Sequence, residues 1–329
     1  MQFGLFGGAR TKRGLGLEDS QGYESFIEYV SEADRLGFRQ LFMVEHHFTG
    51  HGQVSASMTV LAYLAARTRH IRLGTAVVVL PWHNPVLVAE QVATLDLLSG
   101  GRVDFGVGKG YRQAEFDGFC IPIAEATERF DEAMEIIRKA WTSSGRFSHH
   151  GRRWHYDNIV VEPEPMQRPH PPLWMAAGSR DSVRRAAREG YNLLLDQLAQ
   201  IDQIIERIAI FREECARAGR AYDPRIVATA RPLQMIHDES ERAALYETRK
   251  RVIGVIGDLA RDKLPDRIED DTAPLWGTPA EVIARLRQLE AGGATNILLV
   301  DPNASVGNLR AFAREVMPAF LPAAAAVAE

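Results

Sequence analysis

Short apolar segments alternate with longer amphipathic segments along almost the whole chain. The apolar segments resemble strands buried on both faces, and they cover 2–6, 40–44, 71–80, 103–107, 173–177, 192–195, 225–236 and 296–300. Helical spacing of apolar residues predicts helices over 23–37, 57–68, 84–98, 124–142, 181–189, 200–218, from Ser240 onward, 279–291 and 305–319. Strands that are each followed by a helix, eight times over, predict an α/β protein with a (β/α)8 TIM barrel. An open doubly wound sheet has the same alternation and is the alternative.

The alternation is interrupted near 145–172 and again near 255–275. The first interruption contains Gly145, Gly151 and five prolines, which predict a hairpin followed by an extended crossing of the surface. We therefore predict one barrel domain over 1–322 with two insertions, followed by an Ala-rich tail over 323–329.

Composition and charge exclude several classes of protein. Of the 329 residues, 46% are hydrophobic and 25% are charged, as in a folded globular protein. A net charge of −4 offers no positive surface for nucleic acid or anionic lipid. No apolar run approaches the roughly 18 residues of a membrane span, and no signal peptide is apparent. The two cysteines, Cys120 and Cys215, lie far apart, so a reducing cytoplasm is the expected compartment.

In a (β/α)8 barrel the active site lies at the C-terminal ends of the strands. The second predicted strand is followed by Glu45-His46-His47-Phe48, and an imidazole there suits proton transfer near neutral pH. A metal site built from Glu45, His46, His47 and His51 is disfavoured, because adjacent strand residues point to opposite faces. A pair of hydrogen-bonded structural histidines is the remaining alternative.

Two other strand ends suit an anion. Gly106–Tyr111 offers backbone without side chains beside the cation Lys109, although Tyr111 stands where a dinucleotide fingerprint has its third glycine. The stretch Gly178–Ser182 opens a predicted helix, whose N-terminal N–H groups attract anions, and Arg129 is a further cation. Together these features predict a phosphate site. Taken singly, each is a weak signal, and a glycine-rich turn with a solvated lysine or ordinary helix capping explains it better.

Several motifs, in combination and in order, resemble the bacterial luciferase-like flavin monooxygenases over about residues 1–320. The motifs are Met1-Gln2-Phe3-Gly4, Val44-Glu45-His46-His47-Phe48, Gly74-Thr75-Ala76-Val77-Val78-Val79-Leu80-Pro81, Ala89-Glu90-Gln91, Leu95-Asp96, Ser99-Gly100-Gly101-Arg102, Phe105-Gly106, Gly277-Thr278-Pro279-Ala280-Glu281 and Val316-Met317-Pro318. The resemblance implies a (β/α)8 barrel that binds reduced FMN supplied by a separate flavin reductase. It also implies that O2 forms a flavin (hydro)peroxide, which inserts one oxygen atom into a small organic substrate. We also expect a cytoplasmic homodimer.

The resemblance assigns roles to His46, Ala76-Val77, Lys109, Arg129, Ser179 and Ser182, and the residue types add the others named below. His46 falls on the catalytic histidine, and we expect Glu45 to orient it. Ala76-Val77 falls on a non-proline cis peptide bond beneath the flavin ring. The expected phosphate ligands are Lys109, Arg129, Ser179, Arg180 and Ser182. The aromatic residues expected to exclude water from the substrate pocket are Phe6, Trp82 and Tyr111.

The chain also departs from the family pattern. Gly108 replaces a reactive cysteine, Gly178 a glutamate at the phosphate site, and Gln197 a tryptophan that contacts the flavin. The 255–275 stretch is shorter than the family's mobile loop. Light emission is therefore not implied, and the substrate is left open. Two alternatives on the same fold are a deazaflavin-dependent hydride-transfer enzyme and a non-catalytic flavin-binding protein.

Overall fold

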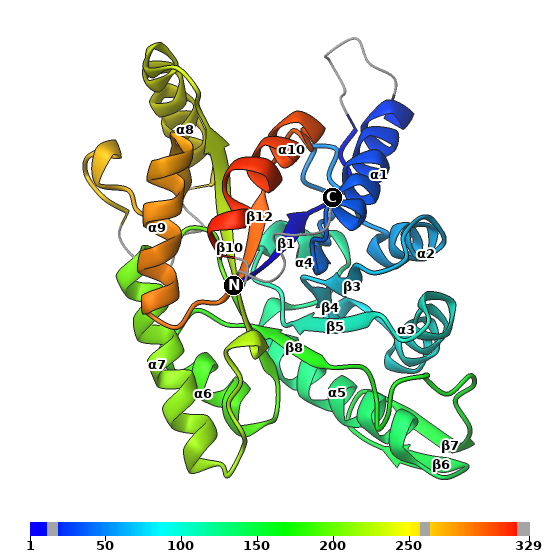
Figure 1. Cartoon of the computed structure of the whole chain (residues 1–329). Coiled ribbons are helices and arrows are strands. Elements are labelled where there is room, and N and C mark those ends of the chain that lie inside the picture. Colours follow the sequence, from blue (N-terminus) through cyan, green and yellow to red (C-terminus); the bar gives the residue numbers. More distant parts are fainter. Residues whose placement is uncertain (12–18, 257–263, 321–329) are drawn as a thin grey trace. The chain divides into compact units, whose positions relative to one another are not determined.

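The computed structural model describes residues 1–11, 19–256 and 264–320. Every predicted strand segment contains a strand: β1 (Gln2–Gly7), β2 (Gln40–Met43), β3 (Arg72–Thr75), β5 (Val103–Gly108), β8 (Leu173–Ala176), β9 (Asn192–Leu195), β10 (Val227–Met235) and β12 (Asn296–Val300). These strands pair in the order given, and β12 pairs in parallel with β1. By these pairings the sheet closes on itself, and the predicted (β/α)8 barrel is confirmed. Figure 1 labels most of these strands and the helices that follow them.

The predicted helices also form. They are α1 (Asp19–Arg35), α2 (Ser57–Arg67), α3 (Pro85–Ser99), α5 (Ala126–Thr142), α6 (Arg180–Arg188), α7 (Ile201–Arg217), α8 (Arg242–Ile256), α9 (Pro279–Ala291) and α10 (Val306–Glu315). Local chemistry sets their bounds, as α3 illustrates. The Asn84 side chain accepts hydrogen bonds from the N–H groups of Val86 and Leu87, and Gly100 ends the helix in the left-handed conformation. No helix in the described ranges is both long and apolar enough to cross a membrane.

The third predicted strand, 71–80, is not continuous, which corrects the prediction. It consists of β3 and β4 (Val78–Val79), which both pair with β5 and leave three residues, 75–77, opposite two. One extra residue in a strand is a β-bulge, a feature common beside active sites. Thr75 bridges the irregular stretch, since its hydroxyl donates to the carbonyl of Gly106 (2.7 Å) and accepts from its N–H (2.9 Å).

The first predicted insertion is confirmed as a hairpin. Its strands β6 (Phe147–His150) and β7 (His155–Ile159) pair in antiparallel fashion. The crossing that follows is held by Gln167, which donates from its backbone N–H and its side-chain amide to Asp96 (2.8 and 2.7 Å). Two further short elements, α4 (Gln113–Gly118) and β11 (Leu275–Gly277), are absent from the sequence prediction because they are too short to show periodicity.

Contacts divide the chain into two compact units. The N-terminal unit contains Gly7–Asp34 and Gln40–Met175, and the C-terminal unit contains Met1–Phe6, Arg35–Arg39 and Ala176–Glu329. The second predicted insertion belongs to the C-terminal unit, but its residues 257–263 lie outside the described residues, as does the predicted tail 323–329. The prediction of one domain over 1–322 stays a prediction.

Each unit has an aromatic core of its own. In the N-terminal unit the ring of Phe42 packs edge-on against Trp174, with centroids 5.0 Å apart. In the C-terminal unit Phe3 packs edge-on against Phe312, with centroids 5.1 Å apart. All four side chains are buried, so each unit supplies a rigid base for the strand ends that it carries.

Candidate active site

The segment that follows β2 carries the first predicted site residues. The N–H of His46 donates to the carbonyl of Val54 (3.1 Å), which anchors the segment. Phe48 then turns the chain with a φ of 55°, in the left-handed region that few residues other than glycine adopt. Gly118 leaves room for this turn, because a Cβ on Gly118 would lie 2.3 Å from the Phe48 ring.

The two imidazoles of this segment, those of His46 and His47, contact two different buried carboxylates. Glu115, on α4, accepts from Nδ1 of His46 (3.0 Å) and from the backbone N–H of His47 (3.0 Å). Glu45 accepts from Nε2 of His47 (3.3 Å) and from Nε2 of His83 (2.8 Å). The prediction that Glu45 orients His46 is therefore wrong, because consecutive side chains leave an extended chain on opposite sides. The catalytic role of His46 stays a prediction.

Both carboxylates have a lowered pKa. Burial alone would raise the pKa of Glu45, but hydrogen bonds from His47 and His83 outweigh it and bring the pKa below its ordinary value. Burial likewise opposes ionisation of Glu115, and hydrogen bonds from His46 and from the N–H of His47 lower its pKa. Each carboxylate is thus ionised at neutral pH and accepts hydrogen bonds only.

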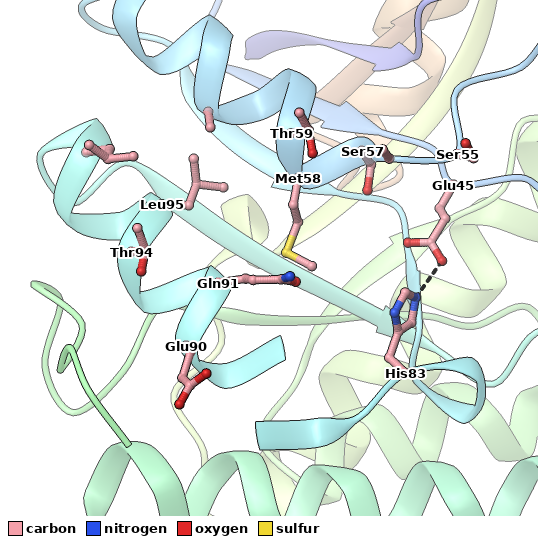
Figure 2. Close-up of a pocket in the computed structure, with 13 residues that line it drawn as sticks. Glu45, Ser55, Ser57, Met58, Thr59, His83, Glu90, Gln91, Thr94 and Leu95 are labelled. Carbon is pink, nitrogen blue, oxygen red and sulfur yellow. Dashed lines mark hydrogen bonds and ion pairs between the residues drawn. The ribbon is translucent and has the colours of Figure 1, made fainter. Parts of the chain in front are cut away.

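Glu45 and His83 also line a cavity of about 530 Å³ between α2 and α3. Figure 2 shows the hydrogen-bonded pair at one end of this cavity, with Met58 of α2 and Gln91 of α3 directed into it. His46 is not among the lining residues. Nowhere in the described part of the chain are three His, Cys, Asp or Glu side chains arranged to hold a metal ion.

The predicted pocket residues lie in both units. Trp82 is half-buried and packs edge-on against His47 (centroids 5.4 Å apart), while its other contacts include stacking on Phe119 (5.2 Å). Tyr111 follows β5 and is 55% exposed. Phe6 is half-buried and belongs to the C-terminal unit. Trp82 is thus the member of the set placed beside the histidine segment, and the shared role of the three residues stays a prediction.

The peptide bond between Ala76 and Val77 is cis, as the resemblance implies. Both residues are half-buried, whereas their neighbours on either side, 73–75 and 78–81, are buried. Gly108 packs closely against Val77, since a Cβ on Gly108 would lie 2.5 Å from the nearer Val77 methyl group. The bulge therefore exposes a small apolar surface of the kind against which a planar cofactor ring fits.

The two predicted cations of the N-terminal unit, Lys109 and Arg129, differ in their hydrogen-bond partners. Lys109 is exposed, and its Nζ donates to the hydroxyl of Thr127 (3.2 Å). No carboxylate within the described ranges pairs with Lys109. Arg129 forms an ion pair with Glu125 (2.9 Å). An anion would therefore find Lys109 available without displacing a carboxylate.

The other predicted phosphate ligands begin α6, in the C-terminal unit. Ser179 accepts from the N–H of Ser182 (3.3 Å), and the Ser182 hydroxyl accepts from the N–H of Ser179 (3.1 Å). Arg180 forms an ion pair with Glu206. These contacts confirm the helix-capping interpretation. Whether the same groups hold a phosphate together with Lys109 stays a prediction.

Glu115 is the site residue that the sequence does not reveal. It lies 69 residues from His46 along the chain, on a helix of six residues with no periodic pattern. The one available signal is its place shortly after the end of β5, since the residues after barrel strands face the active site.

Comparison with known proteins gives one match to a family. A family model described as luciferase-like monooxygenase matches residues 1–296. The oxygenase component of the flavin-dependent trigonelline monooxygenase of Acinetobacter baylyi is 27% identical over 327 residues, covering 91% of this chain and 90% of that protein. Two proteins of Sinorhizobium fredii are 34% and 36% identical, but the chain spans only about half of their length, 53% and 50%.

Solved structures show the same fold. Monooxygenase RslO1 from Streptomyces bottropensis superposes with a TM-score of 0.85 at 26% identity, covering 98% of this chain and all of that one (100%). The coenzyme F420-dependent tetrahydromethanopterin reductase from Methanopyrus kandleri superposes with a TM-score of 0.74 at 19% identity, covering 97% and 99% of the two chains. At that identity the likeness concerns the fold alone, which flavin and deazaflavin enzymes share.

Proposed function

Because the chain belongs to the luciferase-like monooxygenase family, we propose that it is a flavin-dependent monooxygenase. It uses reduced FMN and O2 to insert one oxygen atom into a small organic substrate, and a separate flavin reductase supplies the reduced FMN. The likeness to the oxygenase component of trigonelline monooxygenase over most of both chains supports this proposal.

One observation carries the proposal: a half-buried imidazole, held by a buried carboxylate, lies in the same unit as the cis bulge. Reduced FMN, when bound, supplies the electrons that activate oxygen. The protein then has to transfer protons and exclude water. His46 has Nδ1 engaged with Glu115, which leaves Nε2 to hold or deliver a proton. Trp82 and Phe119 shield the adjoining segment from water.

For the cofactor, we propose that the ring lies against Ala76 and Val77 at the bulge. The proposed phosphate ligands are Lys109, Arg129, Ser179, Arg180 and Ser182. Arg129 and Arg180 already have carboxylate partners, so they would bind the phosphate only by sharing or releasing those partners. Lys109 therefore carries most of the expected electrostatic attraction.

Rapid mixing tests the proposal. Anaerobic protein with FMNH2 is mixed with aerated buffer, and flavin absorbance and hydrogen peroxide are followed. We expect reoxidation slower than that of free FMNH2, and a change of about 100-fold or more in His46→Gln, since proton-transfer groups contribute about 10²–10⁴-fold. The control His51→Gln alters an exposed histidine and should behave as wild type. Reoxidation identical to free FMNH2 at saturating protein would contradict the proposal, and tight binding of a deazaflavin alone would favour hydride transfer.

The substrate and the assembly are proposed more coarsely. Screening aldehydes, ketones and aromatic metabolites with a flavin reductase, and scoring oxygenated product, identifies the substrate class. For assembly we propose a homodimer. Leu87 and Leu98 are exposed on α3 (55% and 64%), a helix with apolar residues on all sides, which is typical of a helix buried against a partner. Sedimentation equilibrium gives the mass in solution, and a monomer at micromolar concentration would contradict the homodimer.

A further inference from the structure

We infer that Glu115 is the positioning residue of His46 and that it decides which ring nitrogen of His46 exchanges a proton. The catalytic meaning of this inference rests on the proposed function. The orientation of the ring does not, because it follows from contacts within the N-terminal unit alone.

The contacts converge on one oxygen atom. Oε1 of Glu115 lies 3.0 Å from Nδ1 of His46 and 3.0 Å from the backbone nitrogen of His47. The Glu115 side chain is only 4% exposed, so water competes poorly for this oxygen. Two donors from adjacent residues fix both the imidazole and the backbone that carries it. Such doubly held rings lose little further freedom when a reaction requires one orientation.

The chemistry of the carboxylate then sets the tautomer. Glu115 is ionised, since hydrogen bonds lower its pKa in spite of its burial. An ionised carboxylate has no proton to donate, so Nδ1 of His46 must carry the hydrogen. The neutral ring then has its lone pair on Nε2, which becomes the nitrogen that takes up a proton and returns it. In serine proteases, removing the charge of the carboxylate that orients the histidine lowers kcat about 10⁴-fold.

Glu45 does not fill this role, although it precedes His46 in the chain. Its Oε1 already accepts from both His47 and His83, and its side chain faces the cavity between α2 and α3 (Figure 2). The alternative, that Glu45 positions His46, can be tested beside the proposal by making the same Glu→Gln substitution at Glu45 and at Glu115.

The first test reads the tautomer in the full chain without flavin. Nitrogen NMR of the ¹⁵N-histidine-labelled protein identifies His46 by the signal lost in His46→Gln. We expect Nδ1 of His46 to be protonated in wild type. The fraction of neutral His46 in this tautomer should fall several-fold in Glu115→Gln. Asp117→Asn, the same change at an exposed position of α4, should have no effect. Glu115→Asp keeps the charge and should lie between wild type and Glu115→Gln, which keeps the test open if the Gln variant fails to fold.

An unchanged His46 tautomer in both Glu115 variants, or a change produced by Glu45→Gln instead, would overturn the inference. The second test repeats the FMNH2 mixing experiment with Glu115→Gln. We expect its reoxidation rate and peroxide yield to shift at least about tenfold toward those of His46→Gln, while the Kd for FMN changes less than about twofold. If wild type shows no FMNH2-dependent reaction but the tautomer responds to Glu115, the proposed function fails and the positioning role stands.

Discussion

His46 and His47 are neighbours in the chain, yet their imidazoles contact different buried carboxylates. Glu115 serves one ring and one backbone N–H, whereas Glu45 accepts from two rings, those of His47 and His83. A carboxylate with a single imidazole partner suits proton transfer, because it does not share its hydrogen bond between two rings. A carboxylate between two imidazoles cross-links the segments that carry them, so we assign Glu45 to stability.

The lowered pKa of Glu45 predicts a pH dependence of stability. Its folded-state pKa lies below the unfolded value, so its stabilising contribution is complete above about pH 5 and is lost as pH falls through the folded-state pKa. We expect the free energy of unfolding of wild type to fall more steeply between about pH 5 and pH 3 than that of Glu45→Gln, measured by urea titration at each pH.

The control for this experiment is Glu90→Gln. Glu90 lines the same cavity as Glu45, but it makes no hydrogen bond or ion pair within the described part of the chain. Its variant should follow the wild-type slope. Equal slopes for wild type and Glu45→Gln would show that the two imidazoles do not stabilise the ionised carboxylate.

Among the secondary-structure elements, the interrupted strand β3–β4 is the one that shapes the site. A continuous strand would bury every residue of 71–80, whereas the bulge leaves Ala76 and Val77 half-buried at the end of the barrel strand. Thr75 replaces the missing ladder bonds, and Gly108 on β5 provides the space that Val77 occupies. The bulge thus depends on a residue without a side chain on the neighbouring strand.

This dependence predicts a cost for Gly108→Ala. The added Cβ would lie 2.5 Å from a Val77 methyl group, so Val77 must shift, and overpacking of this kind costs about 1–3 kcal/mol. We expect urea unfolding to show a loss in that range. Gly145→Ala is the matched control, because nothing lies within 4 Å of a Cβ there, and it should change stability by less than about 0.5 kcal/mol. A Gly108→Ala protein as stable as wild type would mean that Val77 moves freely.

At the scale of the whole molecule, a net charge of −4 does not say which cations are free to bind an anion. Both arginines predicted to bind the phosphate already have carboxylate partners, Arg129 with Glu125 and Arg180 with Glu206. The third predicted cation, Lys109, has a hydroxyl partner and no carboxylate partner within the described residues. Whether Lys109 and the start of α6 bind the same anion stays a prediction.

A double-mutant cycle tests whether Lys109 and Ser182 bind the same phosphate. We expect Lys109→Ala to weaken FMN binding about tenfold, measured by fluorescence titration, through loss of a charge-assisted contact. Riboflavin, which lacks the phosphate, should bind both proteins equally. Ser182→Ala combined with Lys109→Ala should show a coupling energy above about 0.5 kcal/mol if both contact one phosphate. Arg152→Ala removes an exposed arginine paired with Glu128 and serves as the charge control. Additive effects would place the two residues at separate sites.

The sequence by itself determined the architecture, because a barrel strand buried on both faces and an amphipathic helix leave periodic signals that do not depend on distant residues. The eight strand segments, the longer helices and the first insertion were all predictable for this reason. Through its motifs, the sequence also indicated the family and the cis bond at Ala76-Val77. Short elements such as α4 left no signal, since six residues span fewer than two turns.

The tertiary structure alone decided which side chains meet at the site. Adjacency in the chain pointed to Glu45 as the partner of His46, but the fold brings Glu115 there across 69 residues. The ion pairs that Arg129 forms with Glu125 and Arg180 forms with Glu206 were likewise not predicted. Periodicity records which face of an element is buried, whereas a hydrogen bond depends on side-chain directions at the ends of separate elements, and only packing fixes those.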